Sequence, residues 1–157
     1  MAADRVFPRI RARDLEGRDV DLPDAFEGER NIVAVAFLRT HQTQVDSWVP
    51  WFEEFARTDP GLRFYELPTI GRIWAPVRRF IDGGMAAAIR DPVILQRTFT
   101  IYGDVNLITK PLRIDDRSTI TVLCVDRSGD VLWQGAGGFA VPLAQELEKV
   151  LIENGGD

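Results

Sequence analysis

Apolar residues run together, or recur with helical spacing, in the first half of the chain. Residues 31–38, NIVAVAFL, are almost continuously apolar and rich in β-branched side chains, which predicts a strand covered on both faces at the centre of a sheet. In residues 43–57 the apolar side chains fall at i, i+3, i+4 and i+7, which predicts an amphipathic helix. Pro50 should kink this helix, and Thr43 should cap it with Asp46 as the third helical residue.

Shorter patterns flank this strand and helix. Residues 9–22 predict a short, mostly exposed β-hairpin within an N-terminal extension over residues 1–30. The segment LRFYEL at 62–67 predicts a second strand. Between about 71 and 98, Gly and Pro residues separate helical pieces at 72–81, 85–90 and 92–98, which predicts an inserted helical segment.

The last third of the chain has a hairpin pattern followed by a helical one. STITVLCVD at 118–126 and DVLWQ at 130–134 are joined by Arg127-Ser128-Gly129, a tight turn in which Gly supplies a positive φ. Residues 141–154 carry apolar side chains on one face and predict a C-terminal helix. The whole pattern predicts one mixed α/β domain over residues 1–157.

Composition and charge exclude several classes of function. The chain has 24 acidic and 19 basic residues and a net charge of -5, so nucleic acid and membrane surfaces are unsuitable partners, and no stretch is apolar enough for membrane insertion. One Cys and one His cannot form a disulfide, a Cys-x-x-Cys centre or a two-histidine metal site, so we expect neither a metal nor a cofactor. The charged start of the chain predicts a cytoplasmic protein.

The order of the predicted elements is hairpin, strand and helix, strand, helices, hairpin and helix. This order resembles the thioredoxin fold, and DLEGRDVDLP at 14–23 is similar to the N-terminal extension of its thiol-reductase and peroxiredoxin branch. The resemblance implies a mixed central sheet flanked by helices, with the hairpin as an extension and the segment 71–98 as an insertion.

A narrower likeness is carried by several segments in order. These segments are QVDSWVPWFEEF at 44–55, FYEL at 64–67, AIRDPVILQRTFTIYGD at 88–104, ITKPLRI at 108–114 and VLCVDRSGDVLWQGAGG at 122–138. They are similar to the thioredoxin-fold assembly factors of the mitochondrial F-type ATP synthase, which often lack the redox cysteines. This resemblance implies a protein-binding or chaperone-like assembly factor without redox activity.

The residues that carry thioredoxin chemistry are absent. Counting back from Pro50, the positions of the two thioredoxin cysteines hold Gln42 and Val45, and in the peroxiredoxin register the peroxidatic cysteine is replaced by Asp46. The segment 117–120 lacks the proline that precedes the third core strand in this fold. We therefore assign no catalytic residue and expect neither disulfide reductase nor peroxidase activity.

The loop between the first buried strand and the helix is the first candidate site. Such loops are where α/β folds place their ligands, and backbone donors at a helix N-terminus attract anions. Arg39, His41, Gln42 and Gln44 could together bind a carboxylate, a small anion or a peptide backbone. The alternative is a solvated loop that is a relic of the redox site.

Other candidate residues each have a structural alternative. Asp46 and Glu66 are possible acid/base groups, although Asp46 is also explained as a helix cap. Trp51 lies off the apolar stripe and either contacts a partner or packs between helices. Trp133 is open to both interpretations, and Cys124, in the middle of an apolar strand, is predicted to be a buried and unreactive core residue.

These observations favour a function in binding another protein through the loop 39–44, Trp51 and the helical segment. That segment has the Arg-plus-aromatic composition of an interface, or is an ordinary solvated face; its residues are Arg72, Trp74, Arg78, Arg79, Phe80, Arg90 and Arg97. The alternative function is a thioredoxin-fold enzyme, such as a glutathione-binding or peroxiredoxin-like antioxidant oxidoreductase. The partner and the oligomeric state are not encoded in these patterns.

Overall fold

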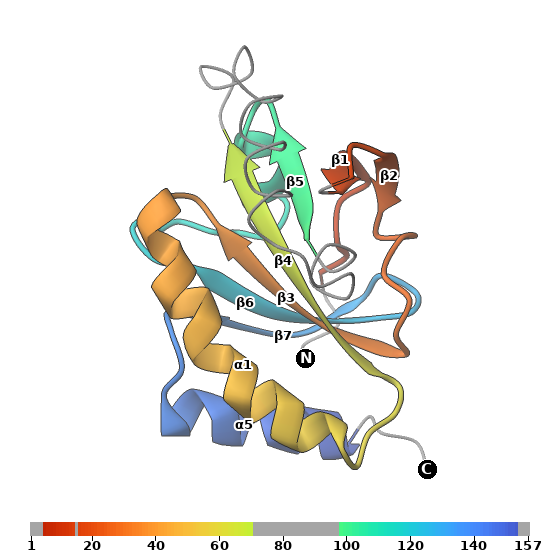
Figure 1. The fold of residues 1–157 in the computed structure, drawn as a ribbon, viewed down its shortest axis with the longest axis vertical. Coiled ribbons are helices and arrows are strands. Elements are labelled where there is room, and N and C mark those ends of the chain that lie inside the picture. The colour runs from red at the N-terminus through yellow and green to blue at the C-terminus, as the bar shows by residue number, and fades with distance from the viewer. Residues whose placement is uncertain (1–4, 15, 71–97, 154–157) are drawn as a thin grey trace.

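The computed structural model describes residues 5–14, 16–70 and 98–153, and it does not describe the side chains of Arg39 and Ile70. Within these residues seven strands form one sheet in the order β2-β1-β5-β4-β3-β6-β7 (Figure 1). The strands are β1 (Ile10–Asp14), β2 (Asp19–Leu22), β3 (Arg30–Ala36), β4 (Leu62–Ile70), β5 (Phe99–Tyr102), β6 (Thr121–Asp126) and β7 (Val131–Ala136). The helices are η2 (Arg39–His41), α1 (Gln42–Ala56), α4 (Asn106–Thr109) and α5 (Val141–Glu153).

Strand β3 lies inside the sheet, as its continuous apolar run predicts. It pairs parallel with β4 and antiparallel with β6, so neither of its edges is open. Residues 30–35 are all buried. The strand ends two residues earlier than predicted, because the chain turns after Phe37 and Leu38 into η2.

Two hydrophobic cores lie on opposite faces of the sheet because side chains alternate along each strand. Ile32 and Ala34 of β3 belong to the core that α1 and α5 cover, together with Trp48 and Leu147. Val33, on the other face, packs with apolar residues of the N-terminal segment and of the region around α4, including Phe7, Leu22, Phe26, Ile108 and Leu112. Figure 1 shows α1 and α5 together on one side of the sheet.

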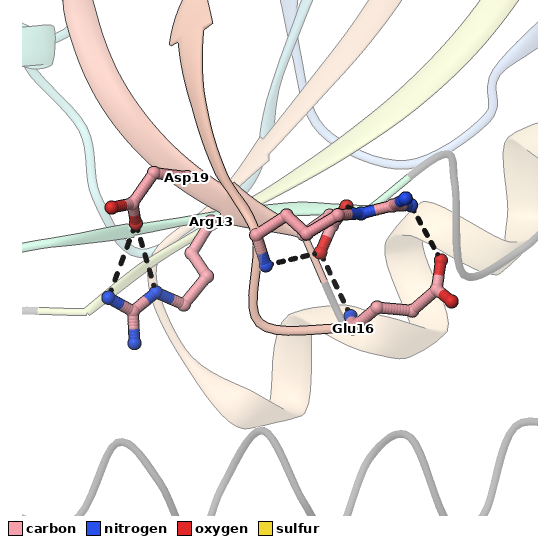
Figure 2. A network of polar contacts seen from close by, with 5 residues as sticks. Arg13, Glu16 and Asp19 are labelled. Carbon is pink, nitrogen blue, oxygen red and sulfur yellow. Dashed lines mark hydrogen bonds and ion pairs between the residues drawn. The ribbon is translucent and has the colours of Figure 1, made fainter.

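The predicted N-terminal hairpin is confirmed, with β1 and β2 paired antiparallel from Ile10 opposite Leu22. It is less exposed than predicted: Ala12, Asp14 and Leu22 are buried. The reason is that β1 also pairs with β5 and so joins the main sheet. The exposed end of the hairpin carries polar contacts (Figure 2): the Asp14 carboxylate accepts hydrogen bonds from the backbone N–H groups of Glu16 and Arg18, and Arg13 pairs with Asp19.

The C-terminal hairpin and helix are also confirmed. Gly129 adopts a φ of 94° in the turn between β6 and β7, as the turn sequence predicts. Strand β6 begins three residues later than predicted, because the backbone N–H of Ser118 donates to the Asp116 side chain in a local turn. The helix predicted over 141–154 is α5.

Two elements were not predicted. Strand β5 begins at Phe99, directly after the helix expected over 92–98, and Thr98 forms a strand-type bridge with Glu66 instead of ending a helix. The four-residue helix α4 has no apolar periodicity of its own. The predicted helical pieces between 71 and 97 lie outside the described residues.

Candidate functional site

The candidate site is the loop that leads from the end of β3 into α1. His41 is the residue that precedes α1, and no side chain caps the helix with a hydrogen bond. The predicted Thr43 cap is therefore wrong: the helix begins one residue before Thr43, so this residue lies within the first turn. The expected kinking residue, Pro50, does lie inside α1.

His41 holds the loop together from inside. Its side chain is only 3% exposed, and its Nδ1 atom accepts hydrogen bonds from the backbone N–H groups of Phe37 at 3.0 Å and Leu38 at 3.3 Å. Because Nδ1 is an acceptor, the hydrogen of the neutral ring is on Nε2. This Nε2 atom is buried and has no hydrogen-bond partner among the described residues. His41 is therefore mainly a structural residue of the loop, with one donor left over.

Gln44 joins the start of α1 to the loop before β6. Its Oε1 atom accepts hydrogen bonds from Thr119 Oγ1 and from the backbone N–H of Ile120, both at 3.0 Å. Those two residues belong to the segment 117–120, which contains no proline, so Gln44 fixes this segment to the start of α1. Its amide oxygen is consequently used within the molecule and is not presented to a ligand.

Gln42 and Asp46 interact with each other on the exposed surface of α1. The Gln42 Nε2 atom donates to Asp46 Oδ1 at 2.9 Å, one helical turn apart. Among the predicted loop residues whose side chains the structure describes, Gln42 is thus exposed, whereas His41 is buried and Gln44 is half-buried. Arg39 begins η2, but its side chain is outside the description.

Trp51 and Glu66 do not belong to this loop. The Trp51 Nε1 atom donates to Glu148 Oε2 of α5 at 2.7 Å, and the ring stacks on Phe55 and meets Trp48 edge-on. These contacts support the interpretation that Trp51 packs between helices.

Glu66 lies on β4, opposite Ala34 of β3. Trp133, the other open case, is buried in the core next to α5, with its Nε1 atom 3.3 Å from Glu146 Oε1.

Sequence reasoning missed a second loop beside the site, residues 137–140. The Trp48 Nε1 atom donates to the Gly137 carbonyl at 3.1 Å, and the Phe139 backbone N–H donates to Ser47 Oγ at 2.8 Å. The Phe139 ring packs edge-on against Trp48 but remains 40% exposed. Leu38, in the loop that leads from β3 through η2 into α1, is 55% exposed. The glycine-rich segment after β7 was the one signal in the sequence that could have indicated this close approach.

The prediction that Cys124 is buried in the core is confirmed. It lies on β6 between Ile32 and Trp133 of the neighbouring strands, and it is fully buried. Burial raises the pKa of the Cys124 thiol from an ordinary value of 9.0 to about 12. The one thiol of the chain is thus neither in the candidate site nor ionised at neutral pH.

Cys124 should be inert to Ellman's reagent in the native protein at neutral pH and should react at once in concentrated guanidinium chloride.

The raised pKa of Cys124 also predicts that the stability of the protein depends on pH. Below pH 9 the Cys124 thiol keeps its proton in both the folded and the unfolded state. Above pH 9 the unfolded chain loses this proton first. The free energy of unfolding therefore falls by about 1.4 kcal/mol per pH unit, up to the folded pKa near 12. Urea unfolding between pH 9 and 11 should show a flatter decline for Cys124→Ala than for the wild type. Equal slopes, or rapid native labelling, would contradict the assignment.

The described residues hold no group of three His, Cys, Asp or Glu side chains able to bind a metal ion. Among the same residues, no helix has the length and apolar character needed to cross a membrane.

The sequence matches no family profile and no curated protein, but its structure resembles those of known proteins. A thiol:disulfide interchange protein from Bacteroides sp. superposes with a TM-score of 0.61 at 21% identity, over 95% of this chain and 90% of that one. The thioredoxin domain of a thiol-disulfide oxidoreductase from Bacteroides vulgatus gives 0.57 at 20% identity, over 95% and 97%. Yeast Sco1 gives 0.61 at 12% identity, over 96% and 94%. These similarities show that the chain has a thioredoxin-like fold.

Proposed function

We propose that this thioredoxin-like protein has no redox activity and binds a segment of another protein at the start of α1. In this proposal it acts as an assembly or chaperone-like factor, similar to the ATP synthase assembly factors that its sequence segments resemble. The binding surface, which we call the α1 edge, consists of the loop 37–41, the first turns of α1, the segment 117–120 and the loop 137–140.

The first support is the chemistry that the α1 edge can no longer perform. Disulfide exchange requires a thiolate that a substrate can reach. The positions expected for the two thioredoxin cysteines, counted back from Pro50, hold the exposed amide Gln42 and the buried Val45, and Cys124 is enclosed in the core. What the fold retains at this position is a rigid surface, which is sufficient for recognition.

The observation that carries the proposal is the pair of exposed apolar side chains on fixed loops. Leu38 and Phe139 flank the first turns of α1, and their loops are held by His41, Ser47 and Trp48. Exposed aromatic and aliphatic groups on a preorganised backbone are typical anchors of protein interfaces. An ordinary solvated loop would not need to be tied down at so many points.

Site-specific photo-crosslinking tests the α1 edge. We expect a photoreactive phenylalanine at position 38 or 139 to give the same cross-linked partner in cells of the source organism. The matched control is position 152: Ile152 is 73% exposed but lies at the far end of α5. Competition with unlabelled protein should remove the adduct, whereas Phe139→Glu should compete poorly. Identical adducts from all three positions, or none from 38 and 139, would contradict the proposal.

The enzymatic alternative is tested separately. Insulin reduction with dithiothreitol and peroxide consumption with a thiol donor should both proceed at the background rate. Titration calorimetry with glutathione should show no binding heat, because the Ile120 backbone N–H, in the loop that holds glutathione in related folds, already donates to Gln44. Measurable turnover that disappears in Cys124→Ser would establish the alternative instead.

A further inference from the structure

A cationic hollow lies between α4 and the segment that precedes β6, and Arg117 is the one described residue of the α1 edge that lines it. It is an open depression of about 630 Å³. Its polar lining consists of Asn106, Thr109, Lys110, Arg113, Asp115 and Arg117. Three of these side chains are cationic and one is anionic, in a protein whose net charge is -5.

Among the described residues, Arg117 is held in place by uncharged acceptors. One of its terminal nitrogens donates to Asn106 Oδ1 at 2.6 Å and to Thr109 Oγ1 at 3.0 Å, and both acceptors are uncharged. A guanidinium has five N–H donors, so its other donors are left for a ligand. Neither Arg117 nor Lys110 forms an ion pair with a described residue. Other arginines of the described part, such as Arg13 and Arg30, are paired with carboxylates.

The backbone around the hollow has a defined shape. The N–H of Ile114 donates to the Thr109 carbonyl at 2.8 Å and that of Arg113 to the Lys110 carbonyl at 3.1 Å, which is the hydrogen-bond pattern of a Schellman motif. Arg113 adopts the left-handed conformation at a φ of 55°, where glycine is the usual residue. The chain thus turns sharply after α4 and returns past it, which places Arg117 beside Asn106.

The carboxylate nearest in sequence does not neutralise Arg117. Asp116 accepts hydrogen bonds from the hydroxyl and the backbone N–H of Ser118, and these bonds lower its pKa. It is therefore occupied by its own turn. Asp115 lines the hollow and offsets part of the positive charge, and the lining remains cationic overall.

The hollow and the α1 edge share the segment 117–120. Arg117 is separated by one residue from Thr119, whose hydroxyl donates to Gln44 at the start of α1. A peptide bound along the segment 117–120 would therefore pass from the apolar side chains of the α1 edge to the guanidinium of Arg117.

We propose that the cationic hollow binds carboxylate side chains of an acidic segment in the protein partner. This inference rests on the proposed function and adds the chemistry of the partner: an apolar residue for the α1 edge followed by aspartate or glutamate for Arg117. Arg117 suits this role because the N–H groups of Nε and of its other terminal nitrogen can still donate to a carboxylate, and hydrogen bonds between two charged groups are stronger than those between neutral groups. The open form of the hollow fits a side chain on a peptide better than an enclosed small molecule.

The test uses a fluorescein-labelled peptide with two leucines followed by four glutamates, and a control peptide with glutamines in their place. Fluorescence anisotropy should show that the glutamate peptide binds about tenfold more tightly, and that added salt weakens only this peptide. Arg117→Gln should remove the preference, and Arg117→Lys should restore only part of it. The matched control, Arg57→Gln at an exposed position directly after α1, should leave this preference unchanged.

Each other outcome overturns the inference. Equal binding of the two peptides, or equal effects of Arg117→Gln and Arg57→Gln, would show that the hollow does not recognise carboxylates. Displacement of the peptide by inorganic phosphate at lower concentration than by free glutamate peptide would make a small oxyanion the ligand. If positions 38 and 139 cross-link a partner but the glutamate peptide is not preferred, only the proposal for the hollow is rejected. If the glutamate peptide is preferred but positions 38 and 139 give no cross-link, only the proposed function is rejected.

Discussion

Replacing Trp48 with alanine should destabilise the folded protein by about 3–5 kcal/mol. Trp48 is fully buried beneath α1, its ring contacts those of Trp51 and Phe139 edge-on, and its Nε1 atom donates to the Gly137 carbonyl. The substitution removes the ring from the core and leaves this carbonyl without its donor. Urea unfolding monitored by circular dichroism would measure the loss as a lower midpoint at an unchanged slope.

Two variants on the same helix show whether the ring or the hydrogen bond matters more. Trp48→Phe keeps most of the aromatic volume and should cost about 1–2 kcal/mol. Glu53→Ala changes an exposed side chain of α1 and should stay within about 0.5 kcal/mol of the wild type. A Trp48→Ala variant as stable as Glu53→Ala would show that Trp48 does not join α1 to the loop 137–140 as described.

The fold was predictable where each element carries its own signal. The apolar run of β3 predicts burial on both faces, and in the structure Val33 and Ile32 indeed belong to different cores. The helical stripe of α1 likewise places Val45, Trp48 and Phe52 in the core, because side chains three and four residues apart share one face of a helix. Such patterns are local and survive in any tertiary context that covers the same face.

Strand β5 could not be predicted in the same way. It has only four residues, FTIY, and its pairing partners are β4 and β1, both distant in sequence. A short apolar segment does not distinguish a strand from the end of a helix, since neither period has room to repeat. The sheet, and not the local sequence, makes Phe99–Tyr102 a strand.

For the candidate site, the sequence predicts where the loop lies but not which contacts its side chains make. Its location after β3 follows from topology, so the loop around His41 and Gln44 was found. The direction of these side chains did not follow, because a polar residue can hydrogen-bond its own backbone as readily as a ligand. Gln44 reaches a backbone N–H that lies 76 residues away, and no sequence period encodes such a contact. The cationic hollow was missed for the same reason, because Arg117 donates to Asn106 only after the chain turns back past α4.

The α1 edge and the cationic hollow both depend on the sheet that carries them, and one buried amide at the opposite end of β3 is central to that sheet. Asn31 is fully buried. Its Nδ2 atom donates to the carbonyls of Gly28 and Val125, each at 3.1 Å, and its Oδ1 atom accepts the Gly28 N–H at 2.9 Å. The side chain therefore fixes the turn that enters β3 and ties it to the end of β6.

Asn31→Ala should cost about 3–5 kcal/mol, because it leaves three buried backbone groups without these partners at about 1–3 kcal/mol each, partly relieved by water. Asn31→Asp keeps the acceptor for Gly28 but points a carboxylate oxygen at two carbonyls. The loss of stability caused by Asn31→Asp should therefore be at least as large as that of Asn31→Ala at neutral pH. It should be smaller in acid, where a protonated carboxyl can donate one hydrogen bond. Gln145→Ala, an exposed amide on α5, is the matched control and should be close to neutral. Urea unfolding at neutral and acid pH distinguishes the cases: equal losses for positions 31 and 145 would show that the buried amide does not anchor β3.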